Sequence, residues 1–371
     1  MKKIKVMVVF GTRPEAIKMS PIVLELQKQL DSFEPIVVVS AQHREMLDQV
    51  LEIFKITPDY DLNIMSQNQT LSEITQKILA KMEEILEQEQ PDIVLVHGDT
   101  TTAFSTALSS FYHKIPIGHV EAGLRTWDKY SPFPEEMNRQ MIDTLSDLHF
   151  APTVTSKENL LCENHTKNIY VTGNTAIDAL NWTVRQDFHH DLLEKIDSEN
   201  KIILMTMHRR ENLGQPMRDV FEAIVKIVEE EPTVEIVFPV HLNPKIRQLA
   251  NEIFGGCSRI HLIEPLDVID FHNFASKSYL ILTDSGGIQE EAPSLDIPVL
   301  VLRDTTERME GIEAGALLLV GTDKEMVYQQ IKELLQNKES YNKLASATNP
   351  YGDGTASKQI LSIIKEYFSA L

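Results

Sequence analysis

The sequence is poor in cysteine and has no long apolar run. Only two of its 371 residues are cysteines, Cys162 and Cys257. They form no CxxC pair, so neither a zinc site nor a dithiol redox site is indicated, and a reducing compartment is expected. No stretch approaches the roughly 18 apolar residues of a membrane span. The apolar stretch at the N-terminus is too short for a signal peptide, so we expect a cytoplasmic chain.

Positive charge is also scarce. Lysine and arginine number 35 against 55 aspartates and glutamates, which gives a formal net charge of −20. Such a surface repels nucleic acids and anionic membranes, so we expect neither as a partner. An anionic small molecule can still bind where basic side chains or helix N-termini reverse the field locally.

Short apolar strands alternate with amphipathic helices along the chain. The predicted strands are Ile4–Val9, Ile36–Val39, Ile93–His97, Ile117–Val120, Leu148–Phe150, Ile169–Val171, Ile202–Met205, Val234–Phe238, Ile260–Ile263, Leu280–Thr283, Val299–Leu302 and Leu317–Val320. Most are continuous apolar runs, which is typical of parallel strands covered by helices on both faces.

This pattern predicts an α/β protein with two Rossmann-like domains whose parallel sheets face a central cleft. The expected domains are residues 1–172 and residues 173–355. A C-terminal helix is expected in 356–371, and packing back onto the first domain is one arrangement open to it.

Ionisable residues gather just after the predicted strands. They lie in residues 11–18, 42–44, 98–102, 121–126, 208–212, 241–244, 284–287 and 303–308. Ligands of open α/β sheets bind beyond the carboxyl ends of the strands, so this pattern indicates a catalytic cleft.

The segment 11–18 reads as a strand-to-helix turn with Pro14 at the helix start, where its missing N–H costs nothing. Arg13 and Lys18 can face an anion there, although a salt-bridged surface turn would look the same. The segment is neither GxGxxG nor a Walker loop, so no nicotinamide or ATP site is signalled.

The segment 284–287 follows a strand and opens a short helix. Its two glycines let a phosphate approach backbone N–H groups at the positive end of that helix. Glu291 could accept ribose hydroxyl protons, and Arg308 could clamp the phosphates. The alternative is a plain turn capped by Asp284 or Ser285.

Several residues are candidates for acid–base chemistry. Asp99 is either a helix cap or a catalyst. Glu121 ends an apolar strand, where partial burial would raise its pKa and suit it to proton transfer. Glu135 and Glu136 follow a proline-rich loop, and either could be catalytic or a solvated acid at a helix start. His208 can titrate near neutral pH. No metal signature such as HExxH occurs.

Six motifs stand in order along the chain: Gly11–Lys18, His97–Thr102, His119–Arg125, His208–Glu211, Leu282–Pro293 and Asn349–Gly354. Together they resemble the motifs of the bacterial non-hydrolysing UDP-N-acetylglucosamine 2-epimerases. The resemblance runs essentially end to end. It implies a fold of the glycosyltransferase-B type, a homodimer, and interconversion of UDP-GlcNAc and UDP-ManNAc for cell-envelope polysaccharides. The implied mechanism is anti elimination of UDP to a 2-acetamidoglucal, followed by re-addition, with no cofactor.

The resemblance also assigns residues. The matches to catalytic positions are Asp99, Glu121, Glu135 and His208. The matches to nucleotide-sugar contacts are Arg13, Lys18, Phe271, Ser285, Gly286, Gly287, Glu291 and Arg308. Which carboxylate removes the C2 proton stays open.

Some members of the family bind a second UDP-GlcNAc as an activator. The matches to that pocket are Gln42, Gln69, Glu135, Arg209 and His241. Glu45 and Asn68 depart from the Gln and Arg of activated members, which argues against strong activation. Met309 stands where the family usually has proline, so the loop carrying Arg308 is expected to be less rigid.

The sequence also leaves other functions open. They are a 2-epimerase of a modified UDP-N-acetyl sugar, a hydrolysing epimerase, a glycosyltransferase of the same fold and a nucleotide-sugar sensor without activity. A transferase needs one base rather than several carboxylates, and a sensor needs no intact catalytic set.

Overall fold

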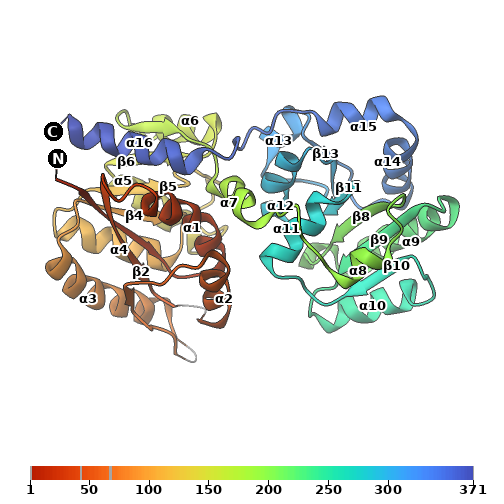
Figure 1. The fold of residues 1–371 in the computed structure, drawn as a ribbon, viewed down its shortest axis with the longest axis horizontal. Coiled ribbons are helices and arrows are strands. Elements are labelled where there is room, and N and C mark those ends of the chain that lie inside the picture. Colours follow the sequence, from red (N-terminus) through yellow and green to blue (C-terminus); the bar gives the residue numbers. More distant parts are fainter. Residues whose placement is uncertain (1, 42–43, 67–68, 371) are drawn as a thin grey trace. The chain divides into compact units, whose positions relative to one another are not determined.

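The computed structural model describes residues 2–41, 44–66 and 69–370. The chain divides into two compact units (Figure 1). Unit 1 comprises residues 1–182 and 352–371, and unit 2 comprises residues 183–351. No helix in the described ranges is long and apolar enough to cross a membrane.

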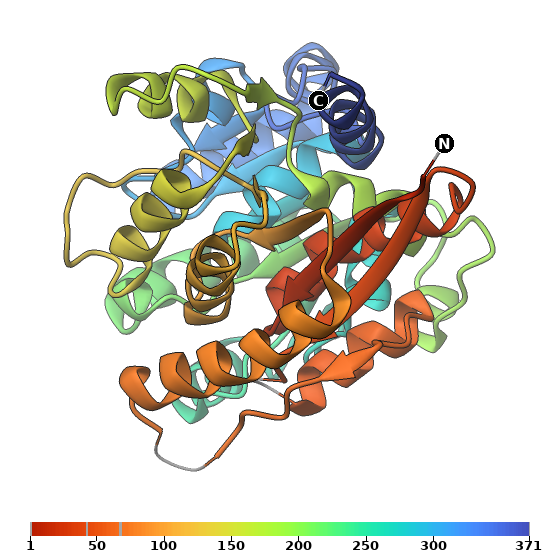
Figure 2. The same ribbon diagram turned by 90° about the vertical axis from the view of Figure 1, so that its left-hand side faces the viewer.

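Unit 1 is built on a parallel sheet of seven strands in the order β3-β2-β1-β4-β5-β6-β7. Its first two strands, drawn in red, lie side by side in Figure 2. The strands are β1 (Ile4–Phe10), β2 (Phe33–Val39), β3 (Tyr60–Asp61), β4 (Ile93–His97), β5 (Ile117–Val120), β6 (Leu148–Ala151) and β7 (Ile169–Val171). The helices are α1 (Arg13–Gln27), α2 (Arg44–Phe54), α3 (Leu71–Glu89), α4 (Thr101–Tyr112), α5 (Glu135–Leu145), α6 (Val154–Cys162), α7 (Thr175–Thr183) and α16 (Ala356–Ser369).

Unit 2 repeats the plan with six parallel strands in the order β10-β9-β8-β11-β12-β13. The strands are β8 (Lys201–Thr206), β9 (Val234–Pro239), β10 (Ile260–Ile263), β11 (Leu280–Thr283), β12 (Val299–Val301) and β13 (Leu317–Leu319). The helices are α8 (Asp191–Lys195), α9 (Gln215–Glu230), α10 (Pro244–Phe254), α11 (Val268–Ser276), α12 (Gly286–Glu291), α13 (Met309–Glu313), α14 (Lys324–Gln336) and α15 (Lys338–Ala345), with 3₁₀ turns η1 (Arg210–Asn212) and η2 (Ala292–Leu295).

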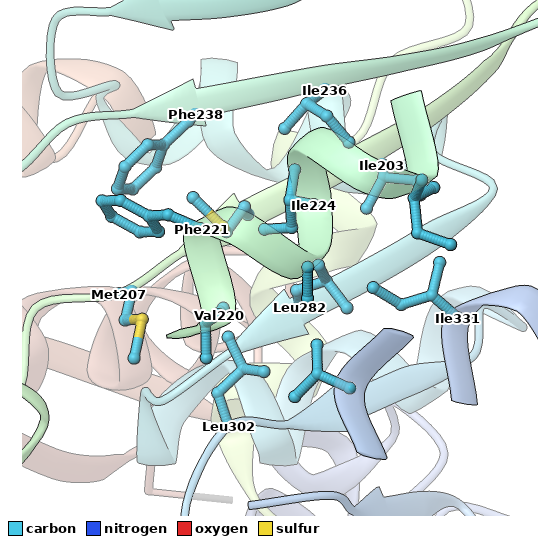
Figure 3. Close-up of a cluster of buried hydrophobic side chains, with 14 of the residues drawn as sticks. Ile203, Met207, Val220, Phe221, Ile224, Ile236, Phe238, Leu282, Leu302 and Ile331 are labelled. Carbon is cyan, nitrogen blue, oxygen red and sulfur yellow. The ribbon is translucent and has the colours of Figure 1, made fainter. Parts of the chain in front are cut away.

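These two sheets confirm the predicted fold class, because both show the strand order of doubly wound nucleotide-binding folds. The twelve predicted strands all form. The additional strand, β3, has two residues and leaves no apolar pattern in the sequence. The core of unit 2 illustrates the packing: apolar residues of α9, among them Phe221 and Ile224, lie against those of the sheet, such as Phe238 (Figure 3).

The first boundary lies at residue 182 rather than at the predicted residue 172. The reason is α7, whose Ala179 is buried in the core of unit 1. The C-terminal helix α16 belongs to the same core through Ile360, Leu361 and Ile364. Asp178 of α7 accepts hydrogen bonds from the backbone N–H groups at the start of α16, which fixes that end of the helix.

Candidate active site

Each sheet has one topological switch point. In unit 1 it lies between β1 and β4, and in unit 2 between β8 and β11. Ligands of doubly wound sheets bind beyond the carboxyl ends of the strands at this point. The segments that follow these four strands contain Arg13, Asp99, His208 and Ser285. The topology therefore brings the predicted residues of each unit to one edge of its sheet.

The turn after β1 is closed by a buried carboxylate. Thr12 caps α1, and Glu15 accepts hydrogen bonds from the backbone N–H of Thr12 at 2.8 Å and of Gly11 at 3.1 Å. Its other oxygen accepts from the Thr100 hydroxyl at 2.8 Å, and burial raises the pKa of Glu15. A Cβ at position 11 would lie 2.0 Å from the Ser40 hydroxyl, so only glycine fits. This turn is rigid before any ligand arrives.

The two cations of this turn differ in their surroundings. Arg13 is half-buried and pairs with no side chain in the ranges that the structure describes. Lys18 forms an ion pair with Glu121, and both side chains are largely buried. Among the described residues of this turn, Glu121 therefore engages the Lys18 ammonium and leaves the Arg13 guanidinium unpaired.

Glu121 directly follows β5, and its backbone adopts the left-handed conformation with φ +67°. Burial by itself would raise the pKa of Glu121, but the charges of Lys18 and His97 outweigh it and hold that pKa well below its usual range. Asn174 adds a hydrogen bond of 3.2 Å. The predicted raised pKa is therefore wrong, because the sequence did not reveal the lysine beside this carboxylate.

Asp99 is not the cap of α4. The hydroxyl of Thr100 takes that place and accepts from the backbone N–H of Ala103 at 3.0 Å. The Asp99 carboxylate instead pairs with Arg139 at 2.5 Å and stays partly exposed. The cap reading of Asp99 is thus wrong, and its carboxylate remains accessible at the sheet edge.

The two neighbouring glutamates at the start of α5 are distinguished by burial. Glu136 is fully buried and accepts from the backbone N–H groups of Thr126 at 3.0 Å and Trp127 at 3.1 Å. It supports the preceding loop. Glu135 is half-buried, and no described residue pairs with its carboxylate. Of the two, Glu135 is thus the one whose carboxylate stays unpaired among the described residues.

In unit 2 the buried carboxylate of Asp284 organises the switch point. One of its oxygens accepts from the backbone N–H groups of His208 at 2.9 Å and Arg209 at 2.8 Å, and from the Asn212 amide at 3.0 Å. The His208 Nδ1 lies 3.2 Å from the other oxygen. The His208 ring stacks on that of His241, with centroids 5.8 Å apart. Asp284 thus orients the imidazole at the sheet edge.

The glycine turn after β11 is left uncapped. Ser285 stands at the N-cap of α12 and makes no side-chain cap bond, and Asp284 is used elsewhere. The Arg308 guanidinium covers Gly286, where a Cβ would lie 3.0 Å from the Arg308 Cζ. Arg308 is paired with Glu290 at 2.8 Å. The alternative of a turn capped by Asp284 or Ser285 is wrong, and the arrangement suits an anion.

Glu291 and Phe271, which lie near this turn, both contact His272. Glu291 lies 3.2 Å from the Nε2 of His272, whose Nδ1 is 2.7 Å from the Thr183 hydroxyl. Phe271 is half-buried and contacts the His272 ring edge-on. His272 thus orients Glu291.

Met309 is the first residue of α13, a position that proline would also accept. The loop before it is tied down without proline. The backbone N–H of Arg308 donates to the Thr306 hydroxyl at 3.1 Å, and that hydroxyl donates to Gln289 at 2.7 Å. These bonds hold the loop, and its lower rigidity stays a prediction.

The family model described as UDP-N-acetylglucosamine 2-epimerase matches residues 25–365. The chain belongs to this family. The UDP-N-acetylglucosamine 2-epimerase of Bacillus subtilis (strain 168) is 62% identical over 364 residues, which are 97% of this chain and 95% of the relative. That of Escherichia coli (strain K12) is 51% identical over 370 residues, 97% of this chain and 98% of the relative.

Solved structures of UDP-N-acetylglucosamine 2-epimerases agree. The Neisseria meningitidis enzyme bound to UDP-GlcNAc has a TM-score of 0.85 at 49% identity and covers 98% of this chain and 100% of its own. The Methanocaldococcus jannaschii enzyme in complex with UDP-GlcNAc and UDP has a TM-score of 0.76 at 35% identity, with the same coverage.

Several polar residues near the candidate site of this 2-epimerase family member were not singled out from the sequence. His97 faces Glu121, and Arg139 pairs with Asp99. His119 joins the Gly98 carbonyl at 2.7 Å to Asp143 at 2.5 Å. Both histidines stand inside apolar strands, where a core role is the ordinary expectation. Their place in the motifs that carry the resemblance was the one available signal.

The residues matched to the family's activator pocket are only partly described. Gln42 and Asn68 lie outside the described residues. The Gln69 amide is bonded to the backbone of Ile64 and Ser66, and the Arg209 Nε donates to the Asp284 carbonyl at 3.0 Å. An activator therefore stays a prediction.

The described residues contain one group with metal-ligating atoms close together, formed by Glu83, Glu87 and His113. His113 follows the last residue of α4, whereas Asp99 precedes the first. The cluster is thus at the opposite end of this helix from the candidate site of the 2-epimerase.

Proposed function

We propose that this chain interconverts UDP-GlcNAc and UDP-ManNAc by anti elimination of UDP and re-addition. The observations that carry the proposal are the residues at the two switch points, each taken within its own unit. Unit 2 offers an uncapped glycine turn covered by Arg308, and unit 1 offers the carboxylates of Asp99, Glu121 and Glu135. Relatives of high identity carry the name UDP-N-acetylglucosamine 2-epimerase.

In the proposed reaction the nucleotide is held by the residues of unit 2. Backbone N–H groups of Gly286 and Gly287, with Arg308, stabilise the charge that develops on the leaving UDP. Glu291 binds the ribose hydroxyls, Ser285 contacts a phosphate and Phe271 lies beside the uracil. The same groups keep UDP bound until it is added back.

The acid–base steps fall to the carboxylates and His208. The C2 proton is barely acidic, so a positioned base must remove it as the C1–O bond breaks. The electron pair of the C2–H bond forms the C1=C2 double bond, and the C1–O pair leaves with UDP. Re-addition on the other face needs a second acid. Asp99, Glu121 and Glu135 are assigned to these roles without a fixed order. The steps move no hydride.

The test is proton NMR of the purified protein with UDP-GlcNAc in D₂O and no added cofactor. We expect UDP-ManNAc that carries deuterium at C2. Free ManNAc with UDP would indicate a hydrolysing enzyme. Retention of the C2 proton with no new sugar would contradict the proposal and direct attention to modified UDP-sugars or a transferase.

Two variants tie the activity to this site. Asp99→Asn and Glu121→Gln should each lower kcat by about 10² or more and leave UDP affinity nearly unchanged, as expected when an acid–base group is lost. Near-wild-type turnover would remove that residue from the mechanism.

The wider setting is proposed on the same basis. We place the protein in the cytoplasm as a homodimer whose product feeds cell-envelope polysaccharide synthesis. Sedimentation of the purified chain tests the dimer. An initial-rate curve with UDP-GlcNAc tests activation, because a second activating site gives a sigmoidal curve.

A further inference from the structure

His97, the last residue of β4, is a buried histidine that the proposed reaction does not yet use. His97 is 4% exposed to solvent. Within the part of the chain that the structure describes, neither ring nitrogen has a hydrogen-bond partner. Buried polar groups are bonded in the great majority of cases, so an unbonded imidazole in a core needs an explanation.

The side chains around His97 supply one. Its Nε2 lies 3.6 Å from the Glu121 carboxylate, slightly beyond hydrogen-bond distance. The charged groups that act on it are Glu15 from α1 and Glu121 from the segment after β5, and Lys18 from α1 pairs with Glu121. Lys18 already neutralises Glu121. The unbonded Nε2 of His97 therefore lies beside a carboxylate that already has an ion-pair partner.

The pair of Glu121 with Lys18 creates a chemical difficulty. A carboxylate stabilised by an adjacent ammonium is a weak base, because protonation of the carboxylate removes the attraction between the two charges. A nearby imidazole removes the difficulty if it takes the proton onward. The carboxylate is then restored beside Lys18, and the proton rests on an imidazolium that two carboxylates, Glu15 and Glu121, stabilise.

We propose that His97 is the proton partner of Glu121. This inference rests on the proposed epimerase function. The C2–H bond breaks, its proton passes to a Glu121 oxygen, and that O–H bond breaks as the His97 Nε2–H bond forms. The electron pair left at C2 forms the double bond and expels UDP. In the reverse direction on the same face, the proton travels from His97 through Glu121 to C2. Because His97 acts through Glu121, it is a positioning residue.

The experiment compares His97→Gln with the wild type and with His149→Gln. His149 lies in the same sheet, is also buried, and has one unbonded ring nitrogen, but its other nitrogen meets the Asp143 carbonyl. It controls for the loss of a buried imidazole from the core. For each protein we measure kcat and KM for UDP-GlcNAc, the UDP affinity, the pH profile of kcat, and the isotope effect with substrate deuterated at C2.

For His97→Gln we expect kcat to fall by about 10², with KM and UDP affinity changed less than threefold. The pH profile of kcat should change shape relative to that of the wild type, because the proton acceptor beside Glu121 is gone. The isotope effect on kcat should grow, since proton transfer becomes slower. His149→Gln should keep kcat within threefold of the wild type.

The proposal is overturned if His97→Gln keeps kcat within threefold, if its pH profile keeps the shape of the wild-type profile, or if His149→Gln loses as much activity. If His97→Gln does not bind UDP, the same measurements are made on His97→Asn. Failure of both variants to fold would assign His97 to stability alone and also overturn the proposal. Failure of the proposed function is a different result: the wild type would form no UDP-ManNAc.

Discussion

At the scale of single residues, one neighbour decides the chemistry of a carboxyl group. Burial acts on the pKa of Glu121 in the predicted direction, but the charges of Lys18 and His97 outweigh it and hold that pKa low. A similar reversal occurs at Asp143, where burial would raise the pKa and the charges of His119 and Arg125 lower it to about 2. These effects depend on contacts between residues far apart in the sequence.

Asp143 gives a prediction for acid stability. Its pKa is about 2 in the folded chain against an ordinary value of 3.8. Because folding lowers the pKa, the ionised carboxylate stabilises the fold above the unfolded value and loses this effect as the pH falls through the folded value. The full effect is about 2 kcal/mol, of which roughly 1 kcal/mol is lost by pH 3.

We expect urea unfolding to show a stability difference between wild type and Asp143→Asn that shrinks by this amount from pH 7 to pH 3. A difference independent of pH would mean that Asp143 acts only through its shape and neutral hydrogen bonds.

Arg308 gives a prediction for binding. Arg308→Ala should weaken UDP binding by about 1.5–3 kcal/mol through the loss of a charged hydrogen bond, as measured by calorimetry. Arg218→Ala serves as the control, because Arg218 makes a surface ion pair with Glu252 in the same unit at 2.8 Å. An unchanged UDP affinity in Arg308→Ala would refute the phosphate role.

At the scale of elements, the turn from β11 into α12 combines two features that sequence patterns treat separately. The helix start has no side-chain cap, and the turn is covered by the guanidinium of Arg308. The second feature depends on the absence of a Cβ at Gly286. The glycine is therefore needed for contact with Arg308 as well as for access to the backbone.

Gly286→Ala tests this contact. The added methyl would lie 3.0 Å from the Arg308 Cζ and push the guanidinium aside. We expect UDP affinity to fall roughly tenfold, about 1.4 kcal/mol, a typical cost of forced repacking. At Gly256 a Cβ would meet no atom within 4 Å, so Gly256→Ala should leave affinity unchanged. Equal affinities in both variants would argue against a role for the Arg308 contact.

At the scale of the whole molecule, both ends of the chain build unit 1. The helix α16 lies against α1 and buries Ile360, Leu361 and Ile364 in the core around β1. Lys365 adds a hydrogen bond of 2.7 Å to Gln29. Unit 1 is thus incomplete until the last residues of the chain are in place.

We predict that Ile364→Ala lowers the free energy of unfolding by about 2–5 kcal/mol, because it leaves a cavity in the core of unit 1. Ser362→Ala, at an exposed position of the same helix, should change it by less than about 0.5 kcal/mol. Urea unfolding measures both. Equal stability of the two variants would show that α16 contributes little to this core.

The sequence by itself determined the fold class, the positions of the strands and the segments after them that carry polar residues. Each of these depends on a local pattern: continuous apolar runs, glycine turns and short motifs read along the chain. The family resemblance rests on the same kind of information, since its motifs are contiguous segments.

Only the tertiary structure decided which of these residues are partners. Lys18 and Glu121 are separated by 103 positions, and Asp99 and Arg139 by 40. The cap of α4, the burial of Glu136 and the packing of α16 were likewise settled by contacts across the fold. The physical reason is that charge, burial and hydrogen bonding depend on distances in space, which a local pattern of residue types does not contain.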